Sequence, residues 1–351
     1  MNTFGKLFRL SIFGESHGNS VGVLLDGVPA GMELNEADFT PDLMRRRPGA
    51  KGTTTRVEAD IPKLVSGVFS GKTTGAPLLI QFANSDTDSS HYEKLKDVPR
   101  PGHADLSARM KFGGFNDYRG SGHFSGRLTV CLVAAGVVAK KMMQEGKVSG
   151  GAGAMQKVKA SENSGGVKVQ ARLLSAGGMP DIDRAVEGAL NDKDSLGGLV
   201  ECRVTGLPAG LGEPFFDSAE SLISHIVFSI PAVKGVEFGA GFVSAQMRGS
   251  EMNDEILDAH GRTRTNTAGG INGGITNGNE LVVRIAVKPT SSIARGQNLL
   301  DMKSGEKKKM GITGRHDACI ALRVPVVLEA AVAIALADLM MQEQKIKRVI
   351  G

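Results

Sequence analysis

A short turn near the N-terminus carries three side chains that could do chemistry. The stretch FGESHG contains Glu15, Ser16 and His17, and Gly14–Gly18 matches the G-x-S-x-G pattern of a serine nucleophile on a sharp strand-to-helix turn. That geometry needs a helix directly after the serine, whereas the next residues, SVGVLLDGV, are rich in β-branched residues and predict a second strand. We therefore predict a strand–loop–strand turn. This disfavours a serine hydrolase and leaves two alternatives, a solvated polar turn or a functional His17.

Two further turns carry an imidazole and a carboxylate. His103 lies in RPGHAD near Arg100, and Asp317 lies in GRHD after Arg315. Imidazole is suited to moving protons near neutral pH, and a carboxylate between basic neighbours can act as a base. Both also have ordinary explanations, because a loop histidine can simply be solvated and Asp317 can belong to a structural ion pair. Convergence of these groups with His17 would favour proton-transfer chemistry.

Other segments are rich in groups that bind anions. Arginine forks bind phosphate and carboxylate bidentately, although a cluster of arginines can also be a basic helix end. VKPTSSI supplies a lysine and short hydroxyl donors, and the glycine-rich loop DYRGSGHFSGR precedes a long apolar helix, where free backbone N–H groups attract anions. A capped helix with a flexible lead-in explains that loop equally well. The arginines of LMRRRPGAKGTTTR are Arg45, Arg46, Arg47 and Arg56.

Two glycine-rich stretches require a separate explanation. SGVFSGKTTG resembles a phosphate-binding P-loop, but three residues instead of four separate Gly67 from Gly71, and Gly75 and Pro77 interrupt a following helix. We predict a tight hairpin there. RTRTNTAGGINGGITNG, residues 262–278, cannot pack a core; its position between helix and strand signals favours a backbone moulded to a ligand over a disordered loop.

Composition narrows the class of protein. The 351 residues are 41% hydrophobic and 23% charged, which is typical of a globular chain with a sizeable core. A net charge of +5 suits an anionic small substrate or nucleic acid, but 5% aromatic residues offer few stacking platforms for nucleic acid. Three distant cysteines predict a reduced protein without a metal site. With no apolar run of membrane length and no signal-peptide pattern, we expect a soluble cytoplasmic protein.

Periodicity and capping residues predict the elements that would position these groups. Two long helices, SGRLTVCLVAAGVVAKKMMQEG with Ser125 as N-cap and RVPVVLEAAVAIALADLMMQEQ, are apolar around most of their circumference and should be buried. Three shorter helices are expected in NEADFTPDLMRRRPG, in DIDRAVEGALNDK and in DSAESLISHIVFSI, where Asp217 and Glu220 have capping-box spacing. Strands are expected at Leu7–Phe13, Val21–Val28, Ala76–Phe82, Leu199–Thr205, Val236–Phe242 and Leu281–Val287.

Two sequence echoes suggest an internal repeat. GVPAGM at residues 27–32 recurs as GLPAGL at 206–211, and AAGVVAKKMMQEG at 134–146 resembles VAIALADLMMQEQ at 332–344. We hypothesise two halves, each running from a strand through a Pro-Ala-Gly turn to a long buried helix. The glycine-rich tract at 149–168 is interpreted as a loop. No clear linker separates the halves, so we expect one interlocked domain over residues 1–351.

Eight of these segments, in this order, resemble the chorismate synthase family: FGESHG, RRRPG, RPGHAD, RGSGHFSGR, IPAVKGVEFG, NTAGGINGGI, KPTSSI and GRHD. The resemblance implies an α+β fold in which antiparallel sheets and buried helices form a layered β-α-β sandwich. It implies a lyase that converts 5-enolpyruvylshikimate-3-phosphate to chorismate, the last step of the shikimate pathway to aromatic amino acids. The reaction is an anti 1,4-elimination of phosphate and a ring proton that uses reduced FMN without net redox change. A homotetramer is also implied.

The resemblance also implies roles for individual residues. His17 matches the family's histidine beside the departing phosphate, His103 the one held against the flavin, and Asp317 the carboxylate that assists removal of the ring proton. Substrate-binding positions are Arg45, Arg46, Arg100 and Arg127; flavin-binding positions are His123, Phe124, Ser125, Pro231, Ala232, Gly273, Lys288, Pro289, Thr290, Ser291, Ser292 and Arg315.

The chain departs from the family pattern in one loop. Many members have Gly-Gly-Gly-Arg-Ser-Ser where this chain has Gly-Ser-Gly-His-Phe-Ser, so His123 replaces an arginine and Phe124 a serine. This departure puts the affinity for the flavin phosphate or the substrate in doubt, and not the reaction. Since the sequence shows no G-x-G-x-x-G in a βαβ setting, we expect an external NAD(P)H-dependent reductant to supply reduced FMN.

Overall fold

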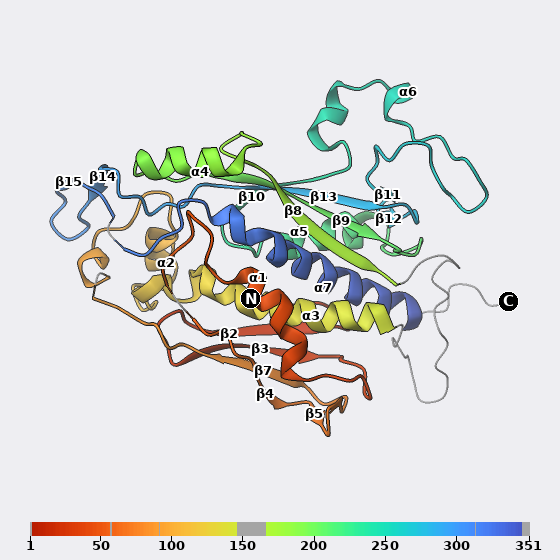
Figure 1. Cartoon of the computed structure of the whole chain (residues 1–351), viewed down its shortest axis with the longest axis horizontal. Coiled ribbons are helices and arrows are strands. Elements are labelled where there is room, and N and C mark those ends of the chain that lie inside the picture. Colours follow the sequence, from red (N-terminus) through yellow and green to blue (C-terminus); the bar gives the residue numbers. More distant parts are fainter. Residues whose placement is uncertain (1, 57, 91, 146–165, 313, 346–351) are drawn as a thin grey trace.

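Two antiparallel sheets enclose a layer of long helices in the computed structural model (Figure 1). The structure describes residues 2–56, 58–90, 92–145, 166–312 and 314–345. Most of the tract expected to be a loop, at 149–168, lies outside the described residues. The layered β-α-β arrangement confirms the predicted α+β class.

The first sheet has the strand order β1-β2-β3-β7-β4. Its strands are β1 (Thr3–Phe4), β2 (Arg9–Gly14), β3 (Ser20–Asp26), β7 (Leu78–Ala83) and β4 (Lys63–Ser66). Alternate residues of β3 and β7, such as Val23 and Ile80, are fully buried against the helices, as a half-buried sheet requires. The strand–loop–strand prediction around Ser16 is confirmed. So is the tight hairpin, formed by β5 (Val68–Phe69) and β6 (Lys72–Thr73).

The second sheet has the order β10-β13-β9-β8. Its strands are β10 (Val233–Phe238), β13 (Leu281–Val287), β9 (Gly198–Thr205) and β8 (Lys168–Ala176). The expected strand Val236–Phe242 begins earlier and ends at Phe238, because Gly239 adopts a φ of 55° and the chain turns into a 3₁₀ helix at Gly241–Gln246. Two small hairpins complete the strands: β11 (Ile271–Asn272) with β12 (Ile275–Thr276), and β14 (Gln297–Leu300) with β15 (Lys307–Met310).

The two long helices lie side by side between the sheets (Figure 1). They are α3 (Thr129–Glu145) and α7 (Val324–Lys345). A Cβ on Gly136 would overlap with Ala330, so the absence of a side chain there permits the close helix contact. The segment containing α7 is long and apolar enough to cross a membrane, but most of it is buried between the two layers. One continuous buried cluster connects both sheets to this pair.

Five shorter helices occur among the described residues; the second and the last of them were not predicted, and the predicted capping signals of the others hold with one correction. They are α1 (Thr40–Arg46), α2 (Asp105–Lys111), α4 (Ile182–Asn191), α5 (Ala219–Val227) and α6 (Gly249–Met252). Asn35 caps a 3₁₀ turn, Glu36–Phe39, that leads into α1 with Pro41 in its first turn. The N-cap of α5 is Ser218, whose side chain accepts from Ser221 N–H; the capping-box prediction from Asp217 placed the helix start one residue too early.

The two halves share one topology, which supports the repeat. In the first half the sheet order is β2-β3-β7-β4, and in the second it is β8-β9-β13-β10. Matching strands in chain order (β2, β3, β4, β7 with β8, β9, β10, β13) makes these orders identical, and every pairing is antiparallel. In each half the Pro-Ala-Gly turn follows the second strand, and a long central helix, α3 or α7, follows the last.

Candidate active site

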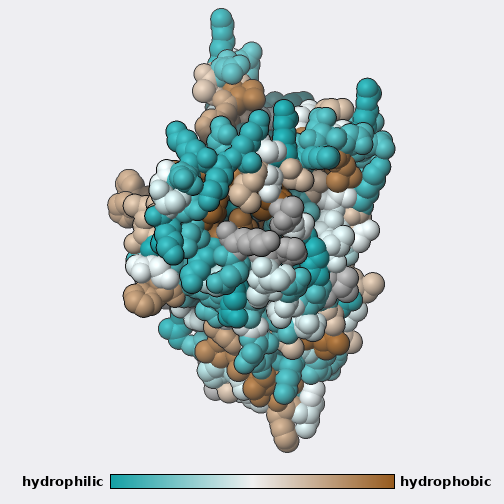
Figure 2. Space-filling model, turned by 90° about the vertical axis from the view of Figure 1, so that its left-hand side faces the viewer, coloured by the Kyte–Doolittle hydropathy of each residue, from teal (hydrophilic) through white to brown (hydrophobic). Residues whose placement is uncertain are grey.

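A cavity of about 610 Å³ opens at one end of the sandwich. Its wall is built from loops: the β2–β3 turn, the segments after α1 and before α2, the lead-in to α3, the turn before β10, the segment after β13 and the lead-in to α7. Figure 2 shows the end of the molecule where β14, β15 and α2 lie, with hydrophilic residues around a depression and hydrophobic residues inside it. The size is typical of a small-molecule site.

His17 lies at the tip of the β2–β3 turn and lines this cavity. Its Nδ1 is 2.8 Å from the Ser89 hydroxyl, and its ring packs edge-on against Tyr92. Burial, followed by the nearby positive charge of Arg56, lowers the pKa of His17 below its usual value. Ser16 is fully buried, and its hydroxyl accepts from Arg56 at 2.8 Å. This arrangement is not a Ser–His nucleophile pair.

The lead-in to α3 packs directly onto this turn. Gly120, Ser121 and Gly122 are consecutive left-handed residues, with φ of 55°, 71° and 53°. A Cβ on Gly120 would overlap with the His17 ring, and Ser16 N–H donates to the Gly122 carbonyl at 3.1 Å. The glycines therefore allow the loop to press against the β2–β3 turn and hold His17 in place.

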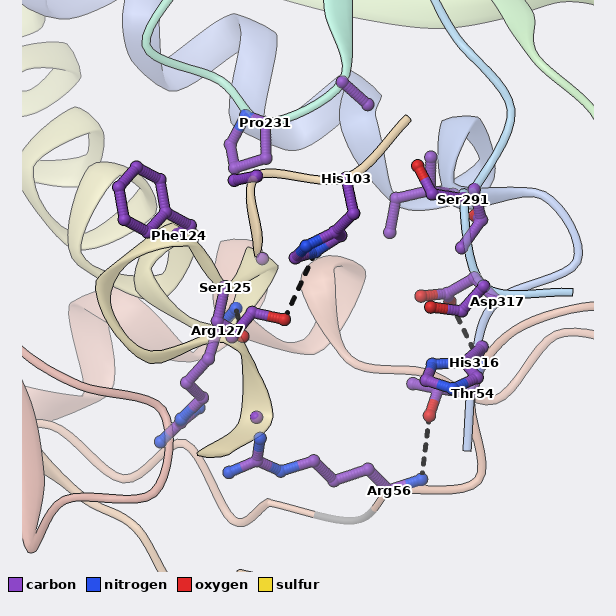
Figure 3. A pocket seen from close by; sticks show the side chains of 18 of the residues that line it. Thr54, Arg56, His103, Phe124, Ser125, Arg127, Pro231, Ser291, His316 and Asp317 are labelled. Atoms are coloured by element: carbon purple, nitrogen blue, oxygen red, sulfur yellow. Dashed lines mark hydrogen bonds between the residues drawn. The ribbon is translucent and has the colours of Figure 1, made fainter. Parts of the chain in front are cut away.

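His103 belongs to a ring of four interacting side chains. Its Nδ1 is 2.7 Å from Asp105 Oδ1, and its Nε2 is 3.3 Å from the Ser121 hydroxyl (dashed line at His103 in Figure 3). Arg100 donates to both oxygens of Asp105 and to Ser121. Burial opposes ionisation of Asp105, but hydrogen bonds from Arg100 and His103 outweigh it and hold the pKa of Asp105 well below its usual value. Asp105 is therefore a carboxylate that accepts the Nδ1–H of His103.

Asp317 lies on another wall of the cavity and is held by three donors. Arg323, from the 3₁₀ turn before α7, donates to both carboxylate oxygens, at 3.1 and 2.7 Å, and Thr54 N–H donates to Oδ1 at 3.0 Å. Figure 3 shows His103, Arg56 and Asp317 pointing into the cavity from different sides. Asp317 is therefore the ion-pair partner that one alternative predicted, and because it also lines the cavity, its role as a base stays a prediction.

Three predicted substrate-binding arginines line the cavity, but their N–H groups donate hydrogen bonds to other groups of the protein. Arg46 and Arg127 both pair with Asp60, and all three side chains are almost fully buried. Burial lowers the pKa of Arg46 to about 10, which leaves it charged at neutral pH. Arg100 is committed to Asp105, as described above. These arginines build the wall that shapes the cavity.

Three predicted site residues lie outside the cavity lining. Arg45 points to the opposite side of α1, where it binds the buried Glu329 bidentately at 2.8 and 2.7 Å. Gly273 forms the turn of the β11–β12 hairpin, which packs on the turn after β9 and lies at the far end of the sandwich (Figure 1). Pro289 stands between the lining residues Lys288 and Thr290 but is not itself part of the lining. The structure gives no support to a contact of these three with a ligand in this cavity.

The other predicted flavin-binding residues do line the cavity: His123, Phe124, Ser125, Pro231, Ala232, Lys288, Thr290, Ser291, Ser292 and Arg315. His123, which replaces the family's arginine, is turned to the protein, with Nδ1 2.8 Å from the Gly14 carbonyl. Phe124 is partly exposed near Phe112. The altered loop therefore links the α3 lead-in to β2.

The lining fits a phosphorylated aromatic ligand. Lys288 and Lys234 both line the cavity, and burial, then the charge of Lys234, lowers the pKa of Lys288. The Thr290 hydroxyl is buried and has no hydrogen-bond partner among the described residues. Pro231 (Figure 3) and Ala232 supply apolar surface to the same cavity, and Ala232 has a left-handed φ of 75°.

Sequence reasoning missed several residues of this site. Arg56 was noted only as a member of an arginine cluster, yet it binds both Ser16 and Glu58 at the cavity wall. Arg323 had no signal at all, since it stands in an apolar helix start. Ser121 was part of a glycine-rich loop, and only its left-handed backbone reveals the strain it carries. No cluster of metal-ligating side chains was found within the described residues.

The site as a whole combines two imidazoles and a carboxylate, which are groups able to transfer protons, with a basic, partly apolar cavity. This combination is typical of an enzyme that acts on an anionic small molecule. Comparison with known proteins gives the family. The sequence model described as chorismate synthase matches residues 8–341. Chorismate synthases of Chitinophaga pinensis and Archaeoglobus fulgidus are 59% and 45% identical to the chain, each over 99% of both sequences. A crystal structure of a chorismate synthase has a TM-score of 0.69 at 25% identity and covers 97% of this chain and 93% of its own. The chain belongs to the chorismate synthase family.

Proposed function

We propose that the chain converts 5-enolpyruvylshikimate-3-phosphate to chorismate and inorganic phosphate in this cavity. The observation that carries the proposal is the convergence of His17, His103 and Asp317, from three distant parts of the sequence, on one basic cavity. The reaction breaks a C–O bond to phosphate and a ring C–H bond, and a new double bond forms. No net oxidation occurs.

Charge complementarity supports the choice of substrate. The substrate carries one phosphate and two carboxylates. The cavity lining contains Lys234 and Lys288, together with Arg56, Arg315 and Arg323, each of which is also paired with a carboxylate of the chain. Preorganised positive charge stabilises a departing phosphate better than water does, because the groups need no reorganisation. We assign the phosphate to the side of Arg56, where His17 lies.

His17 is proposed to donate a hydrogen bond or a proton to the leaving phosphate. Its Nδ1 is held by the Ser89 hydroxyl, so Nε2 is the atom that would face the phosphate. In the free enzyme its lowered pKa favours the neutral ring. A phosphate dianion would favour the protonated ring, so the acid forms when the substrate binds.

His103 and Asp317 are proposed to handle the proton taken from the substrate ring. His103 offers Nε2 to the cavity while Asp105 fixes Nδ1. Asp317 is kept as a carboxylate on the wall by Arg323 and Thr54. Reduced FMN, when bound, supplies the electron density that assists cleavage of the C–O bond. The residues proposed to hold it are Phe124, Ser125, Pro231, Ala232, Lys288, Thr290, Ser291 and Ser292.

The assembly and cellular setting remain proposals. We propose one domain that assembles as a homotetramer in the cytoplasm and receives reduced FMN from an external NAD(P)H-dependent reductant. The projecting segment after β10 (Figure 1) supports assembly. Asp254 accepts from the Thr265 hydroxyl and from the backbone N–H groups of Thr267 and Ala268, while Phe242 and Ile256 are 78% and 70% exposed. An ordered segment with exposed apolar side chains is suited to contact with another subunit.

Complementation tests the proposed function in cells. A bacterial strain lacking chorismate synthase cannot grow without added aromatic compounds, and the chain should restore its growth. The variants H103A and D317A should fail although the protein accumulates to the same level. Absence of rescue by the wild-type chain, with soluble protein present and a reductant for FMN supplied, would contradict the proposal.

A further inference from the structure

Ser121 has a backbone conformation that is unfavourable for serine. Its φ of 71° and ψ of 9° lie in the left-handed region, and both neighbours in this turn are glycines. A residue with a Cβ is destabilised there, whereas glycine is not. The family loop Gly-Gly-Gly-Arg-Ser-Ser has glycine at this place, so the chain carries a hydroxyl at a cost in backbone conformation. Strain of this kind at a cavity wall indicates a function for the side chain.

The contacts of the hydroxyl show what it does. Ser121 Oγ is 3.3 Å from His103 Nε2 and accepts from Arg100 Nη2 at 3.0 Å. On the other side of the imidazole, Nδ1 is 2.7 Å from Asp105. The ring is thus held at both nitrogens, and Arg100 is bonded to both holders. The carboxylate of Asp105 can only accept, so Nδ1 of His103 carries the hydrogen of the neutral ring. Nε2 is then an acceptor, and the Ser121 O–H donates to it.

A hydroxyl can serve His103 in both of its protonation states. It donates to Nε2 of the neutral ring, and by rotating it accepts from Nε2–H of the protonated ring. An alanine or glycine can do neither. His103 would then turn more freely about its side-chain bonds, and Nε2 would be misplaced relative to the cavity.

We propose that Ser121 is a positioning residue for His103, which holds Nε2 toward the cavity in the orientation that proton transfer requires. The proposal rests on the role assigned to His103 above. It adds a residue that is specific to this version of the loop. Ser121 acts through the imidazole.

The test compares S121G with S121A in the full-length enzyme. S121G removes the hydroxyl and relieves the backbone strain, so its thermal midpoint should rise while kcat falls about three- to tenfold, the value of one lost hydrogen bond. S121A removes the hydroxyl and keeps the strain, so kcat should fall similarly without the gain in stability. KM for the substrate should change less than kcat in both variants.

A matched control exists in the β5–β6 hairpin. Ser70 is also a left-handed serine, with a φ of 48°, and it is exposed and absent from the cavity lining. S70G should therefore raise the thermal midpoint as S121G does and leave kcat unchanged. A fall in kcat for S70G equal to that for S121G would overturn the proposal, because strain relief alone would then explain the loss.

An NMR readout separates this proposal from the proposed function. In protein labelled with ¹⁵N-histidine, the His103 signals are assigned by their loss in H103Q. S121G should move the Nε2 resonance toward the position of an imidazole nitrogen that accepts no hydrogen bond. Nδ1 should keep its proton, because its hydrogen bond to Asp105 is unchanged. An unchanged Nε2 resonance overturns the positioning role even if kcat falls. Because the resonance needs no turnover, the result stands whether or not the chain makes chorismate.

Discussion

Gly120 lies directly against the imidazole of His17, so that a Cβ there would overlap with the ring and lie 2.9 Å from the Ser16 hydroxyl. The contact joins two segments about a hundred residues apart, the β2–β3 turn and the lead-in to α3. A backbone without a side chain thus sets the position of the histidine proposed to meet the leaving phosphate.

Gly120→Ala tests this contact. We expect kcat/KM to fall by about 100-fold, because the new methyl group displaces His17 by a distance on the order of 1 Å. Gly114→Ala is the matched control, since Gly114 also has a positive φ, 84°, but a Cβ added there would meet no atom within 4 Å. Equal losses in both variants, measured by steady-state kinetics, would show that the backbone conformation matters and the contact with His17 does not.

Substrate binding should take up a proton at His17. The pKa of this histidine is lowered in the free enzyme by burial and by Arg56, and a bound phosphate dianion raises it again. The pKa of His17 is then higher in the substrate complex than in the free enzyme. The enzyme should therefore bind the substrate most tightly below the pKa of the free enzyme, and binding should weaken as the pH rises through the pKa of the complex. Calorimetry in buffers of different ionisation enthalpy should detect proton uptake in the wild type at pH values just above the free-state pKa. The same uptake in H17N would remove His17 from this role.

Asp317→Asn should reduce kcat by at least about 100-fold while FMN still binds, as expected when a positioned acid–base group is lost. It should also lower the free energy of unfolding by about 2 kcal/mol, because Arg323 loses a bidentate partner in a partly buried site. Arg323→Gln separates the two effects: it breaks the ion pair but keeps the carboxylate. We expect similar destabilisation with a smaller loss of kcat. Full activity in D317N would exclude Asp317 from the reaction.

His103→Ala and His123→Ala should differ sharply, although both histidines line the cavity. H103A should lose at least about 100-fold in kcat and still bind FMN. H123A should lower the free energy of unfolding by about 1 kcal/mol, because the hydrogen bond to the Gly14 carbonyl is lost. Its kcat should change little. Flavin titration, thermal unfolding and kinetics on both variants check this, and a large loss of kcat in H123A would reassign the proton-transferring role.

Arg45 was predicted to bind the substrate and Arg56 was noted only as a member of the arginine cluster, but their contacts predict a structural role for Arg45 and a substrate contact for Arg56. R45A should destabilise the fold by about 2 kcal/mol, because the buried Glu329 loses two hydrogen bonds, and should leave KM within about twofold. R56Q should raise KM for the substrate by about tenfold, the value of one charge-assisted contact. A raised KM in R45A at unchanged stability would return Arg45 to the substrate site.

Local signals predicted the parts of this structure that depend on short-range order. Leu281–Val287 is a strand with the expected bounds, and the two apolar helices form the centre of the sandwich. The end of β10 differs from the predicted end because Gly239 adopts a left-handed backbone conformation. The start of α5 differs because Ser218, and not Asp217, is its N-cap. The partners of Arg127 and Arg45 could not be predicted from the sequence, since Asp60 and Glu329 meet them only when distant segments pack together. Arg100 pairs locally with Asp105, five residues further along the chain.

The most direct test of the account is an anaerobic reaction of the purified chain with 5-enolpyruvylshikimate-3-phosphate and pre-reduced FMN, in which phosphate and chorismate are followed together. We predict equal amounts of both products, formed over many turnovers per flavin, and neither product with oxidised FMN. Phosphate release without chorismate, or no product although the reduced flavin and the substrate are both bound, would contradict the proposed elimination.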